Sequence, residues 1–243
     1  MPDAEDLKEM YSSHYAEMFH GDANMGGLYG VAEVLKWLRQ QVSGTFVDYG
    51  CGAGNLLQAA KDIGWNVLGV EFDPDLTASV AGQKGLRVVT TNQTTPQTAD
   101  VLHLGDVIEH LTDHNNQMPE ILSLLKPGGL LLAQGPLENN ANLFHLAVTI
   151  SRRVRRTRET DMPPYHVLLA TANGQRTFFN RFGLRELQYT IQEEAWPAPS
   201  QIGRPELFNP RALALYTLRR CSQICSALRP QSWGNRYFYA GRK

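Results

Sequence analysis

A glycine-rich turn is the segment whose residue types and spacing most clearly indicate chemistry. Residues 46–56 read FVDYGCGAGNL, which is an apolar strand, three glycines at alternate positions and the start of a helix. Glycines adopt backbone angles that other residues avoid and let a ligand approach the main chain, and a helix N-terminus offers free N–H groups to an anion. The turn therefore predicts a binding site for a small ligand that carries a negatively charged group.

Two carboxylates accompany this turn and narrow the kind of ligand. Asp48 stands two residues before Gly50, and Glu71 ends the next apolar segment of the chain. A carboxylate in the place of Glu71 can accept hydrogen bonds from ribose hydroxyls. The carboxylate of Asp48 suits a ligand with an ammonium group better than a pyrophosphate. A turn with glycines for packing alone is the alternative, and the two acids favour the binding site.

The spacing of the glycines argues against a dinucleotide. Dinucleotide-binding turns follow the pattern G-x-G-x-x-G, whereas this turn is G-x-G-x-G at Gly50, Gly52 and Gly54. A dehydrogenase is therefore disfavoured.

Two histidines are candidates for a general base. His110 follows Asp106 by one helical turn, just after a predicted strand, and His166 lies in a proline-rich loop. Histidine titrates near neutral pH, which suits removal of a proton from a hydroxyl group. The alternatives are a structural histidine at a helix start for His110 and a loop histidine bonded to backbone for His166.

No metal site is predicted. Glu109 and His110 are potential ligands, but adjacent side chains on a helix do not point the same way. Cys221 and Cys225 share a helix face and have no further ligands close in sequence.

The elements that must position these residues alternate between strands and helices. This alternation predicts βαβ units and an α/β, doubly wound, mostly parallel sheet. The expected strands are 45–49, 65–70, 86–90, 100–104, 130–134, 184–191 and 236–240.

The motifs along this pattern resemble those of the class I S-adenosylmethionine-dependent methyltransferases. Besides the glycine turn, the matching segments are VLGVEFDP at 67–74, ADVLHLGDVIEHL at 99–111, LLKPGGLLL at 124–132 and RYFYAGRK at 236–243. The VIEHL and PPYH segments are most similar to the ubiquinone-biosynthesis-like O-methyltransferases.

This resemblance implies a fold and a cofactor. The sheet should have seven strands in the order 3-2-1-4-5-7-6, with strand seven antiparallel and helices on both faces. S-adenosyl-L-methionine should bind over strands one, two and four and leave as S-adenosyl-L-homocysteine. Glu71 would hold the ribose, Phe72 would lie against the adenine, and the Asn92 amide would take the place of a common acidic residue. The expected cofactor residues are Asp48, Gly50, Cys51, Gly52, Gly54, Glu71, Phe72, Asn92 and Asp106.

The chain is expected to form one domain, residues 1–243. It would comprise an N-terminal helical cap at 1–41, a cofactor-binding core at 42–191 and 235–243, and an insertion at 192–234. The insertion and a helix at 139–158 follow strands six and five, so they are expected to form the wall of the acceptor site.

Composition and charge restrict the class of acceptor and the cellular compartment that are expected. The net charge is −1, which excludes the global basic field of non-specific nucleic-acid binders. No signal peptide or apolar stretch long enough to span a bilayer is evident, so a cytoplasmic enzyme is expected.

The expected reaction is O-methylation of a small molecule. N-methylation, methylation of a macromolecule and a non-catalytic cofactor-binding scaffold are the alternatives. An arginine cluster at 152–158 follows the apolar segment 143–150. It is either a solvated helix face or a site for an anionic or lipid-linked acceptor or a membrane surface.

Overall fold

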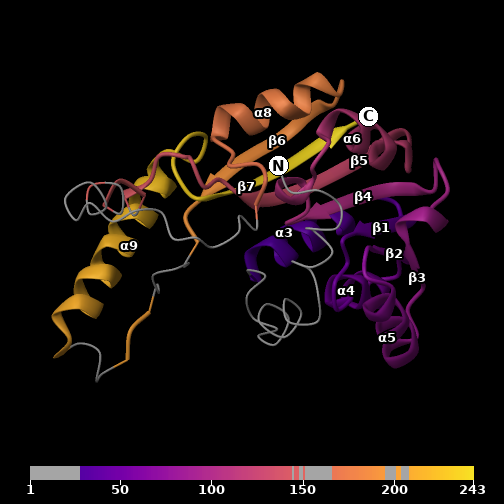
Figure 1. The fold of residues 1–243 in the computed structure, drawn as a ribbon, viewed down its shortest axis with the longest axis horizontal. Coiled ribbons are helices and arrows are strands. Elements are labelled where there is room, and N and C mark those ends of the chain that lie inside the picture. Colours follow the sequence, from indigo (N-terminus) through magenta and orange to yellow (C-terminus); the bar gives the residue numbers. More distant parts are fainter. Residues whose placement is uncertain (1–27, 144, 148–149, 151–165, 195–200, 204–207) are drawn as a thin grey trace.

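One seven-stranded sheet organises the part of the chain that the computed structural model describes, residues 28–143, 145–147, 150, 166–194, 201–203 and 208–243 (Figure 1). The strand order is β3-β2-β1-β4-β5-β7-β6, as predicted. The strands are β1 (Thr45–Tyr49), β2 (Asn66–Glu71), β3 (Val88–Thr90), β4 (Ala99–Gly105), β5 (Leu125–Pro136), β6 (Arg185–Gln192) and β7 (Arg236–Arg242).

The direction of the strands creates a single edge at which a site can form. The pairs β1–β2, β1–β4, β2–β3 and β4–β5 are parallel, and β7 is antiparallel to both β5 and β6. Six strands therefore end at one edge, which we call the carboxyl edge, and β7 begins there. In open sheets of this kind ligands bind outside the carboxyl ends of the strands.

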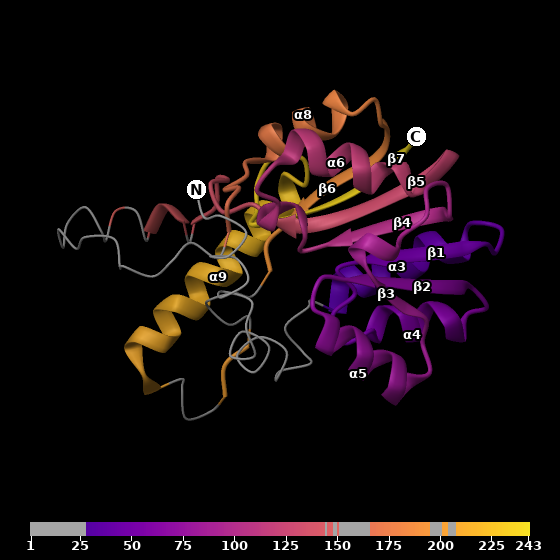
Figure 2. The same cartoon turned by 45° about the vertical axis from the view of Figure 1, so that its right-hand side comes forward.

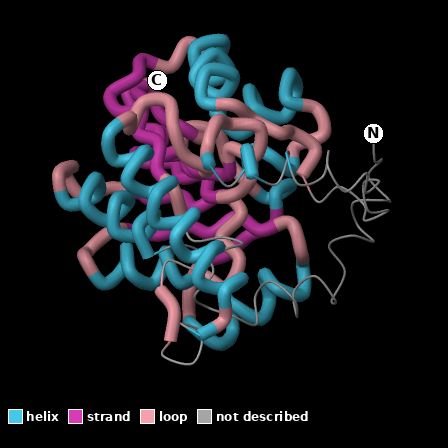
Figure 3. The backbone as a smooth tube through the Cα atoms, turned by 90° about the vertical axis from the view of Figure 1, so that its left-hand side faces the viewer, coloured by secondary structure: helices cyan, strands magenta, loops and turns pink. Residues whose placement is uncertain are grey.

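Helices cover both faces of the sheet, and Figure 3 shows them on either side of the strands. The helices are α3 (Leu28–Arg39), α4 (Asn55–Asp62), α5 (Pro74–Lys84), α6 (His114–Ser123), α8 (Ala172–Arg181) and α9 (Pro210–Leu228). One core cluster joins α3, α4 and α5 to the sheet through residues such as Leu38, Leu57 and Val80. The other joins α6 and α8 to the opposite face through Met118 and Phe179.

Local sequence explains where several helices begin and end. The Asp73 carboxylate accepts hydrogen bonds from N–H groups in the first turn of α5, and Pro74 occupies the first helical position. Gly85 ends the helix in the left-handed conformation. Asn209 and Pro210 begin α9 in the same way. Figures 1 and 2 show α9 extending away from the sheet on the side of the carboxyl edge.

Two segments differ from the expectation in ways that matter for the site. The fifth strand begins at Leu125 and contains the Lys-Pro-Gly-Gly segment as an irregularity, where the pairing with β4 jumps from Leu125 to Leu130. His110 ends a short 3-10 turn, η2 (Ile108–His110), and the helix after β4 begins only at His114.

Several expectations concern residues outside the described ranges. They are most of the N-terminal cap, the arginine cluster at 152–158 and the PPY segment at 163–165.

Candidate functional site

The glycine turn has the geometry that its sequence requires. Gly50, Gly52 and Gly54 have φ angles of 77°, 48° and 71°, in the left-handed region that favours glycine. The N–H groups of Gly50 and Cys51 donate to the carbonyl oxygen of Val70, at 2.8 and 3.2 Å. The turn is therefore tied to the end of β2, which brings the first two strand ends together.

Glu71 lies across this turn. Its Oε2 accepts a hydrogen bond from the Gly52 N–H at 2.8 Å, and its Oε1 accepts one from the Phe72 N–H at 2.8 Å. The ring of Phe72 is 61% exposed, so it offers an apolar surface next to the carboxylate. The two side chains predicted to hold ribose and adenine thus stand together beside the glycines.

Asp48 is buried below the turn and has a partner, His103, that no sequence motif indicated. Its Oδ1 accepts from Nδ1 of His103, on the neighbouring strand β4, at 2.7 Å. Burial, followed by the charges of Asp48 and Glu71, raises the pKa of the Cys51 thiol. Both carboxylates therefore act electrostatically on Cys51 in the turn.

Asn92 and Asp106 lie at the same edge with partners of their own. Asn92 is exposed in the 3-10 turn η1 (Thr91–Gln93), where its Oδ1 accepts from the Thr90 hydroxyl at 2.5 Å. The Asp106 carboxylate accepts from the Arg236 guanidinium of β7 at 2.6 and 2.9 Å. Asp106 therefore links β4 to β7, and any contact with the cofactor would be made alongside this ion pair.

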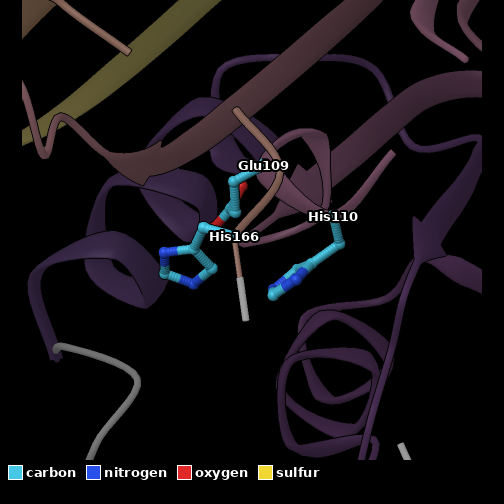
Figure 4. A group of neighbouring side chains, drawn as sticks. All are labelled: Glu109, His110 and His166. Atoms are coloured by element: carbon cyan, nitrogen blue, oxygen red, sulfur yellow. The ribbon is translucent and has the colours of Figure 1, made fainter. Parts of the chain in front are cut away.

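The two candidate histidines meet, although 56 positions separate them in the chain. The N–H groups of Val167 and Leu168 donate to the Glu109 carbonyl oxygen at 2.7 and 3.1 Å. This pins the loop after β5 onto η2, and the rings of His110 and His166 lie edge to face with centroids 4.9 Å apart (Figure 4). The Nδ1 of His166 also lies 2.8 Å from the Glu138 carboxylate.

Glu109 completes this group from below. Its side chain is 4% exposed, and its Oε1 has no hydrogen-bond partner among the described residues. Burial, with the nearby charge of Asp106 as the second cause, raises the pKa of Glu109 well above its usual value. The site thus holds a carboxyl group that is protonated more readily than an exposed one.

Glu109 and His110 were not expected to hold a metal, because adjacent side chains diverge on a helix. The structure differs from that expectation, since His110 ends the short turn η2 and the loop after β5 brings His166 to the same place as a third group. Potential ligand atoms of Glu109, His110 and His166 all lie within 4.8 Å of one another. A carboxylate with two imidazoles is a donor set that divalent transition metals accept.

The histidine group lies next to the glycine turn. A Cβ atom added at Gly50 would stand 2.6 Å from Cγ2 of Val107, the residue directly before η2. The glycine turn and the candidate bases therefore lie side by side at the carboxyl edge.

This arrangement agrees with the comparison with protein families. Residues 29–215 match the model of a family described as a methyltransferase domain. The chain belongs to this family. S-adenosylmethionine is the cofactor of the domain, as its resemblance to the class I methyltransferases implied.

Curated relatives of the methyltransferase domain match about half of the chain. A ubiquinone biosynthesis O-methyltransferase of Rhodopseudomonas palustris is 32% identical over 120 residues, 45% of this chain and 46% of that protein. A ribosomal protein L11 methyltransferase of Symbiobacterium thermophilum is 32% identical over 111 residues, 42% of this chain and 36% of that protein. The chain spans less than half the length of each of these relatives. Their acceptors differ, so the similarity does not identify the acceptor here.

A solved structure supports the fold across almost the whole chain. A SAM-dependent methyltransferase from Archaeoglobus fulgidus has a TM-score of 0.54 at 16% identity, with 96% of this chain and 100% of that chain covered.

Proposed function

We propose that the protein transfers the methyl group of S-adenosylmethionine to a hydroxyl group of a small molecule. The pairing of His110 with His166 beside the glycine turn is the observation that carries this proposal, because it puts proton acceptors next to the cofactor residues. N-methylation and methylation of a macromolecule are the alternatives, and a scaffold without turnover is a third. We also propose that the reaction takes place in the cytoplasm.

The glycine turn and its two carboxylates would bind the cofactor. Gly50 and Gly54 let the turn adopt its close-packed shape, since a Cβ at either position would meet a neighbouring side chain within 2.8 Å. Asp48 would attract the α-ammonium group, and Glu71 would accept from the ribose hydroxyls. Phe72 would cover the adenine and Asn92 would meet its edge, while Asp106 would border the methionine end.

Bound S-adenosylmethionine supplies the methyl group, and the protein's task is to align an acceptor and remove its proton. We propose that the imidazole of His110 removes this proton, and His166 is the second candidate for the same role. The Glu138 carboxylate holds Nδ1 of His166, which leaves Nε2 of that ring as the atom available to an acceptor.

The same group could act through a divalent cation. Glu109, His110 and His166 would hold the ion, and an acceptor hydroxyl bound to it would lose its proton more easily. The buried Glu109 carboxylate favours this reading, because a cation would satisfy the oxygen that has no partner among the described residues.

The variant His110→Ala tests the role of His110 as the base. His110→Ala should lower turnover on an acceptor found by mass-shift screening by about 10²–10⁴-fold, the usual range for loss of a general base. Its affinity for S-adenosylhomocysteine, measured by calorimetry, should stay nearly unchanged. If His110 only packs η2, the variant would lose thermal stability and keep its turnover per folded molecule.

The cation is tested by titrating Mg²⁺, Mn²⁺ and Zn²⁺ into chelator-treated protein. Binding that Glu109→Gln and His166→Ala abolish, together with restored turnover, supports the metal. Full turnover in chelator without any bound metal leaves His110 as a metal-free base.

We further propose that the segments after β5 and β6 form the acceptor wall. Both strands end at the carboxyl edge, and the segments are joined, since the Leu143 N–H donates to the Ser222 hydroxyl at 3.2 Å. The Asn140 amide donates to the carbonyl oxygens of Ser232 and Gly234. Leu143 and one face of α9, from Pro210 to Cys221, line a mostly apolar groove.

The exposed surface beside this groove supports a lipid-linked or anionic acceptor. Phe208, Ile224 and Leu228 are 89%, 60% and 77% exposed, and α9 contains arginines but no acidic residue. Such a surface suits the polar-apolar boundary of a membrane. Among the residues that the structure describes, no helix is long and apolar enough to cross a membrane.

A further inference from the structure

The buried pair of Asp48 and His103 is a polar contact that the proposed reaction does not yet use. The two residues are direct neighbours across β1 and β4 and are 4% and 3% exposed. The distance from Nδ1 of His103 to Oδ1 of Asp48 is 2.7 Å. A buried carboxylate costs free energy unless hydrogen bonds satisfy it, so this contact determines how the Asp48 side chain lies.

The imidazole is held firmly in this position. The ring of Phe46 stacks on it at a centroid distance of 6.3 Å and an interplanar angle of 28°. Beyond the ring lies Gly105, where an added Cβ would stand only 2.6 Å from Cε1 of His103. The glycine thus leaves the space that the imidazole occupies.

The hydrogen-bonding pattern indicates which proton the ring carries. A carboxylate only accepts, so the hydrogen lies on Nδ1 of His103. Nε2 is buried and has no partner within the described part of the chain. A bare nitrogen acceptor is tolerated there more easily than a buried N–H with nothing to accept it. The ring therefore orients Asp48 as a neutral donor, and the carboxylate keeps its negative charge.

We infer that His103 is a positioning residue for the cofactor. It fixes the Asp48 carboxylate below the glycine turn and does not neutralise its charge, whereas an arginine or lysine in its place would. The charge is therefore free to meet the α-ammonium group of S-adenosylmethionine. This inference rests on the proposed contact between Asp48 and that ammonium group.

A double-mutant cycle with two ligands tests the inference. The variants are His103→Leu, which removes the donor, His103→Asn, which keeps an N–H at the place of Nδ1, Asp48→Asn, and the combination of His103→Leu with Asp48→Asn. Calorimetry gives the dissociation constants of S-adenosylhomocysteine and of 5′-methylthioadenosine, which lacks the amino-acid part. Thermal melting of each variant confirms that it is folded.

His103→Leu should weaken S-adenosylhomocysteine binding about tenfold, as expected for loss of a hydrogen bond to a charged group. It should leave 5′-methylthioadenosine binding nearly unchanged, and His103→Asn should behave like the wild type. In the Asp48→Asn background, His103→Leu should cause little further loss. If His103→Leu does not fold, the inference is tested by His103→Asn, which must then retain the preference for S-adenosylhomocysteine over 5′-methylthioadenosine.

Two results overturn the inference, and they are distinguishable. Equal weakening of both ligands by His103→Leu, or the same loss with and without Asp48→Asn, shows that His103 only supports the fold. Unchanged S-adenosylhomocysteine binding in Asp48→Asn removes the contact between Asp48 and the cofactor, and with it the role of His103.

Discussion

Among single residues, Glu71 should matter most directly to the cofactor. Its two oxygens accept from the N–H groups of Gly52 and Phe72, so the carboxylate is already oriented at the turn. Glu71→Ala should weaken S-adenosylhomocysteine binding by about 1–3 kcal/mol, the usual value for lost hydrogen bonds to a charged group. Calorimetry measures this effect.

Glu71→Gln is the matched control, because it keeps one acceptor oxygen and should lose less affinity. Thermal stability should change little in both variants, since Glu71 ends its strand at the ligand edge. An unchanged dissociation constant in Glu71→Ala would remove this residue from the ribose site.

The residues of the site differ in how far the sequence could predict them. The glycine turn and Glu71 belong to one continuous strand-turn-helix-strand segment, so their spacing alone places them together. The meeting of His110 and His166 depends on two backbone hydrogen bonds to Glu109 from a distant loop. No pattern along the chain encodes that contact, and the same is true of the ion pair between Asp106 and Arg236.

At the scale of elements, the conformation of the glycine turn should be sensitive to a single methyl group. Gly50 has a φ angle of 77°, and a Cβ there would meet Val107 at 2.6 Å. Gly50→Ala should lower the free energy of unfolding by about 1–3 kcal/mol, the range for a strained backbone position. It should also weaken cofactor binding.

Gly82→Ala is the matched control, because Gly82 lies in α5 and no atom of the described residues would stand within 4 Å of an added Cβ. The free energy of unfolding of that variant should rise by about 0.5–1 kcal/mol, since alanine stabilises a helix more than glycine does. Urea unfolding measures both variants. An unchanged free energy of unfolding in Gly50→Ala would show that the turn can relax to accept the methyl group.

The elements themselves were largely predictable, because buried parallel strands read as apolar runs and helices carry caps at their ends. The strand order was confirmed, although it came from the family resemblance. The extent of β5 and the 3-10 turn at η2 were not predictable, since both depend on the neighbouring strand and on the loop that packs against them.

The junction of α9 with the end of β6 should respond to pH. Glu193 lies at this junction, paired with Arg219, and both side chains are fully buried. Burial outweighs the attraction of Arg219 and raises the pKa of Glu193 from 4.5 to about 7. A raised pKa favours the protonated form in the folded state, so this contribution to stability is complete below about pH 4.5 and is lost as the pH rises to about 7.

Glu193→Gln should remove this dependence. Between these pH limits the wild type should lose up to about 3 kcal/mol of unfolding free energy relative to the variant. Urea unfolding at several pH values across the window measures the difference. If the free energy of unfolding of the wild type instead increased relative to that of the variant as the pH rises, the attraction to Arg219 would be the larger effect.

For the whole molecule, the exposed apolar surface of α9 predicts membrane association. Ile224 and Leu228 lie on this surface near the exposed Arg220. The protein should sediment with vesicles that contain anionic lipid more than with neutral ones, and replacing Ile224 and Leu228 with serine should reduce this binding.

Val42→Ser is the matched control, because Val42 is 92% exposed and precedes β1 at the opposite edge of the sheet. Equal binding of the wild type and the α9 variant would exclude α9 as the contact surface.

The place of β7 between β5 and β6 has a consequence for the order of folding. Within the described residues β6 has no other neighbour in the sheet, and β7 pairs with β5 over a separation of about one hundred residues. Closing such a long loop is slow, because its entropy cost precedes the contacts that reward it. Until β7 is inserted, β6 with its helices α8 and α9 has no strand to dock on. We therefore predict that β6, α8 and α9 form last, after β1 to β4 have assembled from contacts between neighbouring segments.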